Sequence, residues 1–160
     1  MGGQAQPMDL LPTWPRVPTD QECEAILGAA WTPREKAIIG LMLMGGLRRG
    51  EVLGLNVEDV SADYAQILVR GKGSKERMVP LCPALRGLLI AHLEGRGACP
   101  GPLFVGRTGR RMTVTSFIRL FRRVLKRVSL EDEHITRTSS DTPLGQAWYG
   151  RAWMSRPSQS

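Results

Sequence analysis

The chain has 160 residues, which is enough for one ordinary domain with its own core and too few for two. Its net charge of +7 and sequence pI near 10.0 favour a polyanionic partner over an acidic substrate. The three cysteines lack metal-ligand spacing and no apolar run could span a membrane, so we expect a cytoplasmic protein without metal, disulfide framework or membrane contact.

The first part of the chain predicts a leader followed by two helices. Residues 1–16 are rich in proline and glycine and predict a flexible leader. Thr19 opens the capping box T-D-Q-E, so a helix should run from there to about Ala30. Thr32 opens a second box, T-P-R-E, and the helix that follows should end at the glycine pair 45–46.

The middle of the chain predicts a short helix and a β-hairpin. Residues 48–53 should form the helix, held on the core by Leu47, Val52 and Leu55. Residues 65–69 and 76–81 are β-rich and flank a glycine-containing turn, which predicts two antiparallel strands. A further short strand is possible at residues 56–60.

Two longer helices follow, so the predicted fold class is α+β and mostly helical with a small antiparallel sheet. Pro83 should start the first, whose apolar stripe consists of Leu85, Leu88, Leu89 and Leu93. Thr113 should cap the second, whose apolar residues keep a helical period: Phe117, Leu120, Phe121, Val124, Leu125 and Val128.

The second of these helices belongs to a strongly basic segment. From Arg107 to Arg127 there are eight basic residues and no acidic one. Charge runs are usually solvated helix faces, but a merely soluble helix tends to carry interspersed acids. We therefore favour contact with a phosphate backbone, through Arg119, Arg122, Arg123 and Lys126.

A second candidate site spans residues 45–81. Arg48 directly follows the glycine-ended helix, and Lys72 lies between two glycines at the hairpin turn, G-K-G-S-K-E. A guanidinium and a turn-tip ammonium together suit a phosphate. Alternatively, Arg48 simply pairs with Glu51, three residues on, and Lys72 is a solvated turn lysine. A P-loop is excluded because the G-x-x-x-x-G-K-[ST] spacing is absent.

Two motifs in this region resemble the catalytic domain of tyrosine recombinases, the phage-integrase family. GGLRRGEVLGL is similar to the family box T-G-L-R-x-x-E-x-x-x-L, and GKGSKERMVPL is similar to its hairpin G-K-G-x-K-x-R-x-V-P-L. The resemblance covers residues 17–136, which we expect to be the N-terminal part of that catalytic domain. It implies the family's DNA breaking–rejoining fold, incomplete at the C-terminus.

The resemblance also implies roles for individual residues. Arg48 matches the first transition-state arginine, and Lys72 matches the hairpin lysine that protonates the leaving oxygen. We add Lys75 and Arg77 of the hairpin to the expected DNA contacts. The family uses neither metal nor nucleotide cofactor. Its members assemble as tetramers on double-stranded DNA, and we expect this fragment to contact DNA without forming the tetramer.

Residues 137–160 depart from the family pattern. They read RTSSDTPLGQAWYGRAWMSRPSQS, with no apolar period, and predict a disordered tail. Codons allowed for these residues, preceded by one extra C and regrouped, encode P-H-E-L-R-H-T-F-G-T-S-M-V-R-A-G-V-D-V-K-T-L-P-E, as the family continues. We therefore expect a single-base deletion before codon 137. Neither Tyr64 nor Tyr149 matches the family's nucleophile.

Three interpretations follow from this break. The chain is a truncated, catalytically inactive tyrosine recombinase that still binds DNA, which we favour. Alternatively, it is a basic, non-catalytic DNA-binding module that functions in its own right. The third interpretation is an unstable gene remnant, since missing helices would leave apolar surface uncovered.

Overall fold

The computed structural model describes residues 20–97 and 99–129. The elements run α2 (Asp20–Gly28), α3 (Pro33–Leu43), α4 (Arg49–Leu53), η1 (Val57–Asp59), β1 (Gln66–Arg70), η2 (Lys72–Ser74), β2 (Glu76–Pro80), α5 (Pro83–Arg96) and α6 (Val114–Arg127). The predicted leader, the Thr19 cap and the tail 137–160 lie outside the described residues. The helices outnumber the two strands of the described fold, so the α+β, mostly helical prediction is confirmed.

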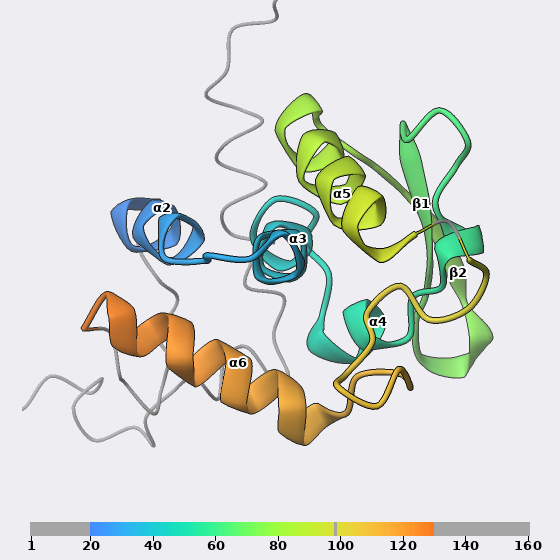
Figure 1. Cartoon of the computed structure of the whole chain (residues 1–160). Helices are drawn as coiled ribbons and strands as arrows, with labels where there is room; N and C mark the ends of the chain where they lie inside the picture. Colours follow the sequence, from blue (N-terminus) through green and yellow to red (C-terminus); the bar gives the residue numbers. More distant parts are fainter. Residues whose placement is uncertain (1–19, 98, 130–160) are drawn as a thin grey trace, which may run out of the picture.

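Helix α3 is the centre of the fold and lies between α5 and α6 (Figure 1). Every residue from Ala37 to Leu43 is buried, which is the pattern of a helix covered on all sides. Gly40 permits the close crossing with α5, because a Cβ there would lie 2.8 Å from Leu88 Cδ1 and 3.1 Å from Leu85 Cδ1. The helix begins as predicted, with Thr32 Oγ1 accepting the Glu35 N–H at 3.1 Å.

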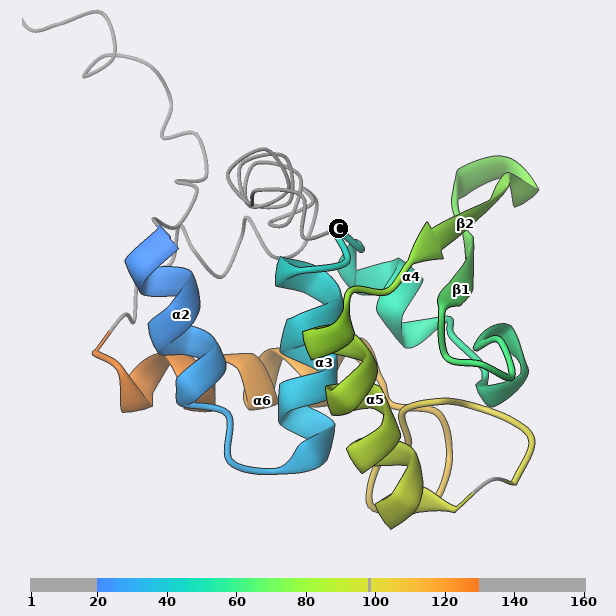
Figure 2. The same cartoon turned by 90° about the horizontal axis from the view of Figure 1, so that it is seen from above.

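The β-hairpin lies beside α4, on the side of the fold away from α2 (Figure 2). Strands β1 and β2 pair antiparallel, with Ile67 opposite Val79 and Arg70 opposite Glu76. Both strands are confirmed to within one residue. The possible strand at 56–60 is wrong: this segment forms the 3₁₀ turn η1, flanked by isolated bridges from Asn56 and Val60. An Asn56 N–H bond to Asp59 Oδ2 at 2.8 Å closes the turn and takes the backbone out of strand geometry.

Helix α6 closes the other side of the core. Thr113 Oγ1 accepts the Ser116 N–H at 3.2 Å and caps the helix as predicted. The predicted apolar stripe is buried at Phe117, Leu120, Phe121, Val124 and Leu125. Within the described ranges, no helix has the length and apolar character that crossing a bilayer requires.

A buried ion pair fastens the end of α6 to the start of α3. Arg127 Nη1 donates to Glu35 Oε2 and to the Ala29 carbonyl, both at 2.9 Å, and its guanidinium lies 3.6 Å above the Trp31 ring. Glu35 is 3% exposed and also accepts the Trp31 N–H at 2.8 Å. Burial favours protonation, but these hydrogen bonds and the Arg127 charge outweigh it, so the pKa of Glu35 is lowered.

Removal of this carboxylate should destabilise the fold. We expect Glu35→Ala to reduce the free energy of unfolding by about 3 kcal/mol, because it leaves the Arg127 guanidinium nearly buried and unpaired. Urea unfolding followed by circular dichroism measures the change. Glu94→Ala on α5 is the control, since an exposed carboxylate should change stability by less than about 0.5 kcal/mol. Equal stabilities of the two variants would contradict the expectation.

Candidate nucleic-acid interface

Arg48 lies where the buried helix α3 gives way to the short helix α4. Gly46 turns the chain with a φ of 69°, and Leu47 is fully buried, so the next residue emerges at the surface. Arg48 is the N-cap of α4, in extended conformation. Its guanidinium is exposed and, among the residues that the structure describes, has no hydrogen-bond or ion-pair partner. The structure therefore presents a cation on a fixed backbone.

Glu51 is the anchor of this region, but its ion-pair partner is not Arg48. From Arg48 the Glu51 carboxylate accepts the backbone N–H alone, at 2.8 Å. Arg77 of β2 forms a two-pronged pair with it, Nη1 to Oε1 at 2.7 Å and Nη2 to Oε2 at 3.0 Å. Burial alone would raise the pKa of Glu51, but the hydrogen bonds from Arg77 and Arg48 lower it. The simple helical pair between Arg48 and Glu51 is thus not formed.

The turn that carries Lys72 starts beside the same carboxylate. A Cβ at Gly71 would lie 3.7 Å from Glu51 Oε1, and the Gly71 N–H donates to the Lys75 carbonyl at 2.8 Å. Gly73 has a φ of 73°, which explains the second glycine of G-K-G. The backbone of Lys72 is therefore held in a closed turn next to the anchor of Arg48, while Lys75 is exposed.

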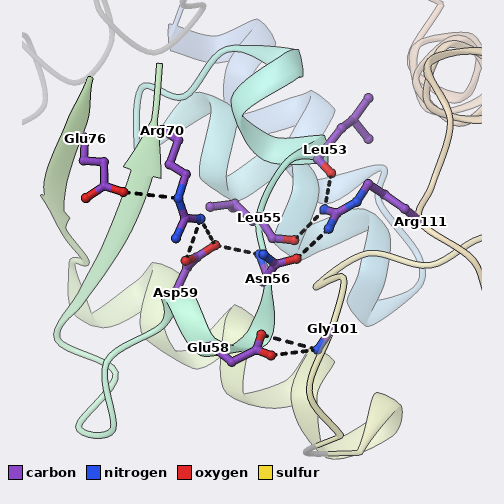
Figure 3. Close-up of polar contacts among 9 residues, drawn as sticks. All are labelled: Leu53, Leu55, Asn56, Glu58, Asp59, Arg70, Glu76, Gly101 and Arg111. Carbon is purple, nitrogen blue, oxygen red and sulfur yellow. Dashed lines mark hydrogen bonds and ion pairs between the residues drawn. The ribbon is translucent and has the colours of Figure 1, made fainter. Parts of the chain in front are cut away.

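A second set of polar contacts joins the hairpin to the body of the fold (Figure 3). Arg70 Nη1 lies 2.8 Å and 2.9 Å from the two carboxylate oxygens of Asp59, which is 6% exposed. The chain of contacts continues through Asn56 to Arg111, whose Nη2 donates to Asn56 Oδ1 at 2.5 Å. Arg111 Nη1 also donates to the carbonyls of Leu53 and Leu55, at 2.9 and 3.1 Å. Arg111 therefore holds the segment before α6 against the end of α4.

The basic segment divides into structural and free cations. Arg111 and Arg127 are occupied by the carbonyls and carboxylate described above. The four α6 residues predicted to contact DNA are exposed and have no hydrogen-bond or ion-pair partner within the described ranges: Arg119, Arg122, Arg123 and Lys126. All four occupy helix positions between those of the buried stripe. The structure thus leaves their charge available to a ligand.

A groove of ≈ 390 Å³ opens between the start of α6 and the turn before it. Its lining includes Thr113 and Ser116 and five arginines, namely Arg34, Arg107, Arg111, Arg119 and Arg123, and none of the residues recorded along it is acidic. Five guanidinium groups around one groove favour an anion with several oxygens, such as a phosphodiester.

Neither a metal site nor a tyrosine accompanies these cations in the described part of the chain. No group of three or more His, Cys, Asp or Glu residues there could hold a metal ion. Tyr64 precedes β1, with a φ of 56°, and so lies at the far end of that strand from the Lys72 turn. Five strand residues place about 17 Å between those ends. Tyr149 lies outside the described residues.

Comparison with known proteins identifies the family. The sequence profile of the phage integrase family matches residues 16–147, and the chain belongs to this family. It is 36% identical over 131 residues to tyrosine recombinase XerC of Rhodospirillum centenum, covering 78% of this chain and 38% of that protein. For XerC of Syntrophus aciditrophicus the identity is 32% over 127 residues, with 71% and 41% covered. The chain thus spans about two fifths of the length of these relatives.

Solved structures show the same fold. The crystal structure of XerA recombinase has a TM-score of 0.72 at 24% identity, over 91% of this chain and 54% of that one. The Tn1549 transposon integrase, solved in complex with transposon right end DNA, has a TM-score of 0.65 at 19% identity, over 96% and 59%. The predicted tyrosine-recombinase catalytic-domain fold is confirmed.

Several functional candidates could not be found from the sequence. Arg34 reaches the groove from α3, where its Nη1 donates to the Val105 carbonyl at 2.9 Å, although the two residues are 71 positions apart. Arg107 was counted in the basic segment but not selected as a contact. The structural tasks of Arg111 and Arg127 left no local signal, because their partners lie in other elements.

Proposed function

We propose that this chain is part of a site-specific DNA recombinase of the tyrosine recombinase class and that it binds double-stranded DNA. The observation that carries the proposal is the free positive charge of α6 together with the five-arginine groove, which favours phosphate oxygens. Its family membership and the DNA present in the Tn1549 integrase structure support the same substrate. The protein would act in the cytoplasm.

The reaction of the complete enzyme is a phosphoryl transfer. A tyrosine oxygen attacks the scissile phosphorus, the bond to the 5′ oxygen breaks, and a 3′-phosphotyrosyl link and a 5′-hydroxyl result. Arg48 would stabilise charge on the phosphorane-like transition state, and Lys72 would give its proton to the leaving 5′ oxygen. A 5′-hydroxyl of another strand then reverses the step, so no cofactor is consumed. We propose that this chain neither cleaves DNA nor forms the tetramer expected of complete enzymes.

Binding to DNA tests the proposal directly. Because the free cations are suited to phosphate rather than to base edges, we expect weak, sequence-tolerant binding that falls steeply with salt. A gel-shift titration of the 160-residue chain on two unrelated duplexes, at several salt concentrations, measures it. Failure to bind either duplex at low salt would remove the DNA-binding proposal and leave the gene remnant. Strong preference for one duplex would contradict the expectation of backbone contacts alone.

A further inference from the structure

We infer that Arg70 and Arg77 are positioning residues, which clamp the β1–β2 hairpin so that its Lys72 turn stays in register with Arg48. The inference rests on the proposed function, because it gives the hairpin turn a phosphate to meet. It assigns to Arg77 a task different from the DNA contact expected from the sequence. Two ion pairs, one on each strand, carry it.

The first clamp joins β2 to α4. The Arg77 fork places two nitrogens on two oxygens of Glu51, whose side chain is 9% exposed. The same carboxylate accepts the N–H of Arg48 at 2.8 Å. One nearly buried group therefore touches both the strand that leaves the Lys72 turn and the residue that presents the first guanidinium. A rotation of the hairpin would have to break this fork.

The second clamp joins β1 to η1. Arg70 pairs with Asp59, whose side chain is 4% exposed, and also approaches Glu76 of β2, Nε to Oε1, at 3.3 Å. Arg77 lies opposite Val69 and therefore on the face of the hairpin that Val69 occupies. Arg70, the next residue along β1, points to the other face. The hairpin is thus held from both of its faces, at the end that carries the turn.

The clamps meet a physical need of this fold. A two-stranded hairpin is at best marginally stable by itself, and β2 pairs only with β1 in the described sheet. Core packing of Ile67, Val69 and Val79 anchors one face, but the turn from Gly71 to Lys75 extends beyond these residues. Fixing both strands immediately before the turn limits the volume that Lys72 can sample. That restriction raises the effective concentration of its ammonium near a phosphate bound at Arg48.

A direct contact of Arg77 with DNA would work against this geometry. Its guanidinium already uses both fork positions on Glu51, and transfer to a phosphate would leave a nearly buried carboxylate without its partner. The free cations of α6 carry no such cost. The two interpretations therefore differ in the coupling between Arg77 and Lys72: a positioning role makes the effects of the two substitutions non-additive, whereas two independent DNA contacts make them additive.

A double-mutant cycle on DNA affinity separates the interpretations. In the unaltered chain, Lys72→Ala should weaken binding to a random-sequence duplex by roughly three-fold, as for one phosphate contact. In the Arg77→Gln and Glu51→Gln backgrounds the same change should have almost no effect, because the turn is no longer held. Arg77→Lys should behave like Arg77→Gln, since an ammonium keeps the charge but cannot form the fork. In the Arg122→Gln control background the Lys72→Ala effect should stay three-fold.

Amide hydrogen exchange supplies a readout that does not depend on DNA. The Gly71 and Arg77 amides should exchange faster in Glu51→Gln and in Arg77→Gln than in the unaltered chain. Their exchange in the double variant should be no faster than in either single variant, and the amides of α6 should keep their protection. An undiminished Lys72→Ala effect in the Arg77→Gln background would overturn the inference and return Arg77 to the DNA contacts. If the unaltered chain binds no DNA, the proposed function fails, and hairpin exchange decides the clamp alone: unchanged Gly71 exchange would overturn it.

Discussion

A protein translated from a gene whose reading frame is restored at codon 137 should form a covalent adduct with DNA. Arg48→Ala should reduce the rate of adduct formation by roughly 10² to 10³-fold. The reason is that the substitution removes the guanidinium held at the N-cap of α4, so the negative charge that develops on the phosphorane-like transition state is no longer stabilised. Lys72→Ala should slow the step by roughly 10²-fold through poorer protonation of the leaving oxygen. The protein must extend to the expected tyrosine and be given the DNA site that it recombines. Denaturing gels resolve the adduct.

Arg49→Ala is the matched control, because it removes the same side chain one position later, where no role in the reaction is proposed. The 160-residue chain itself should give no adduct, and an adduct from it would disprove its inactivity. The frame expectation has an independent test in the DNA sequence around codon 137. Codons that cannot be regrouped into P-H-E-L-R-H would rule out the single-base deletion.

The second large effect concerns the outward face of α6. We expect a variant with glutamine at its four free cations to have a slope of log K against log salt that is smaller in magnitude by roughly 3 to 4. The residues replaced are Arg119, Arg122, Arg123 and Lys126. Each phosphate contact that is lost no longer releases a counterion. Binding to duplex DNA at several salt concentrations, measured by fluorescence anisotropy, gives the slope.

Two variants that each lose one positive charge test whether the change in slope comes from the position of the charge or only from the net charge of the protein. Arg122→Gln should lower the slope by roughly 0.9, whereas Arg86→Gln on α5 should leave it nearly unchanged. Helix α5 lies on the opposite side of α3 from α6 (Figure 1). Arg86 of α5 donates to the Asp63 carbonyl at 3.0 Å. Equal slopes for these two variants would mean that α6 is not the DNA-facing element.

The parts of the fold that were predictable have local causes. The Thr32 and Thr113 caps, the glycine end of α3 and the stripe of α6 are each written within a few neighbouring residues. The strand considered possible at residues 56–60 is a turn instead, because the Asn56 N–H bonds to the Asp59 side chain. Backbone hydrogen bonding to a nearby side chain overrode the strand pattern at this point.

The candidate site was less predictable, because the number of basic residues does not show which of them already have an ion-pair or hydrogen-bond partner within the protein. Arg119 and Arg127 look equivalent in the sequence, yet one is free and the other is committed to Glu35, 92 residues away. Arg77 likewise has its carboxylate 26 residues away, on another element. Only the tertiary arrangement distinguishes the available cations from the structural ones.

The contact of Arg127 with Ala29 and Glu35 has a consequence for the order of folding during translation. It spans 98 and 92 residues, nearly the full length of the described chain. While the ribosome is still adding α5, this fastening of the turn after α2 has no partner. The nascent chain can complete α3, α4 and the hairpin first, because their contacts are closer in sequence. The turn after α2 is therefore fastened to α6 only after residue 127 has left the exit tunnel.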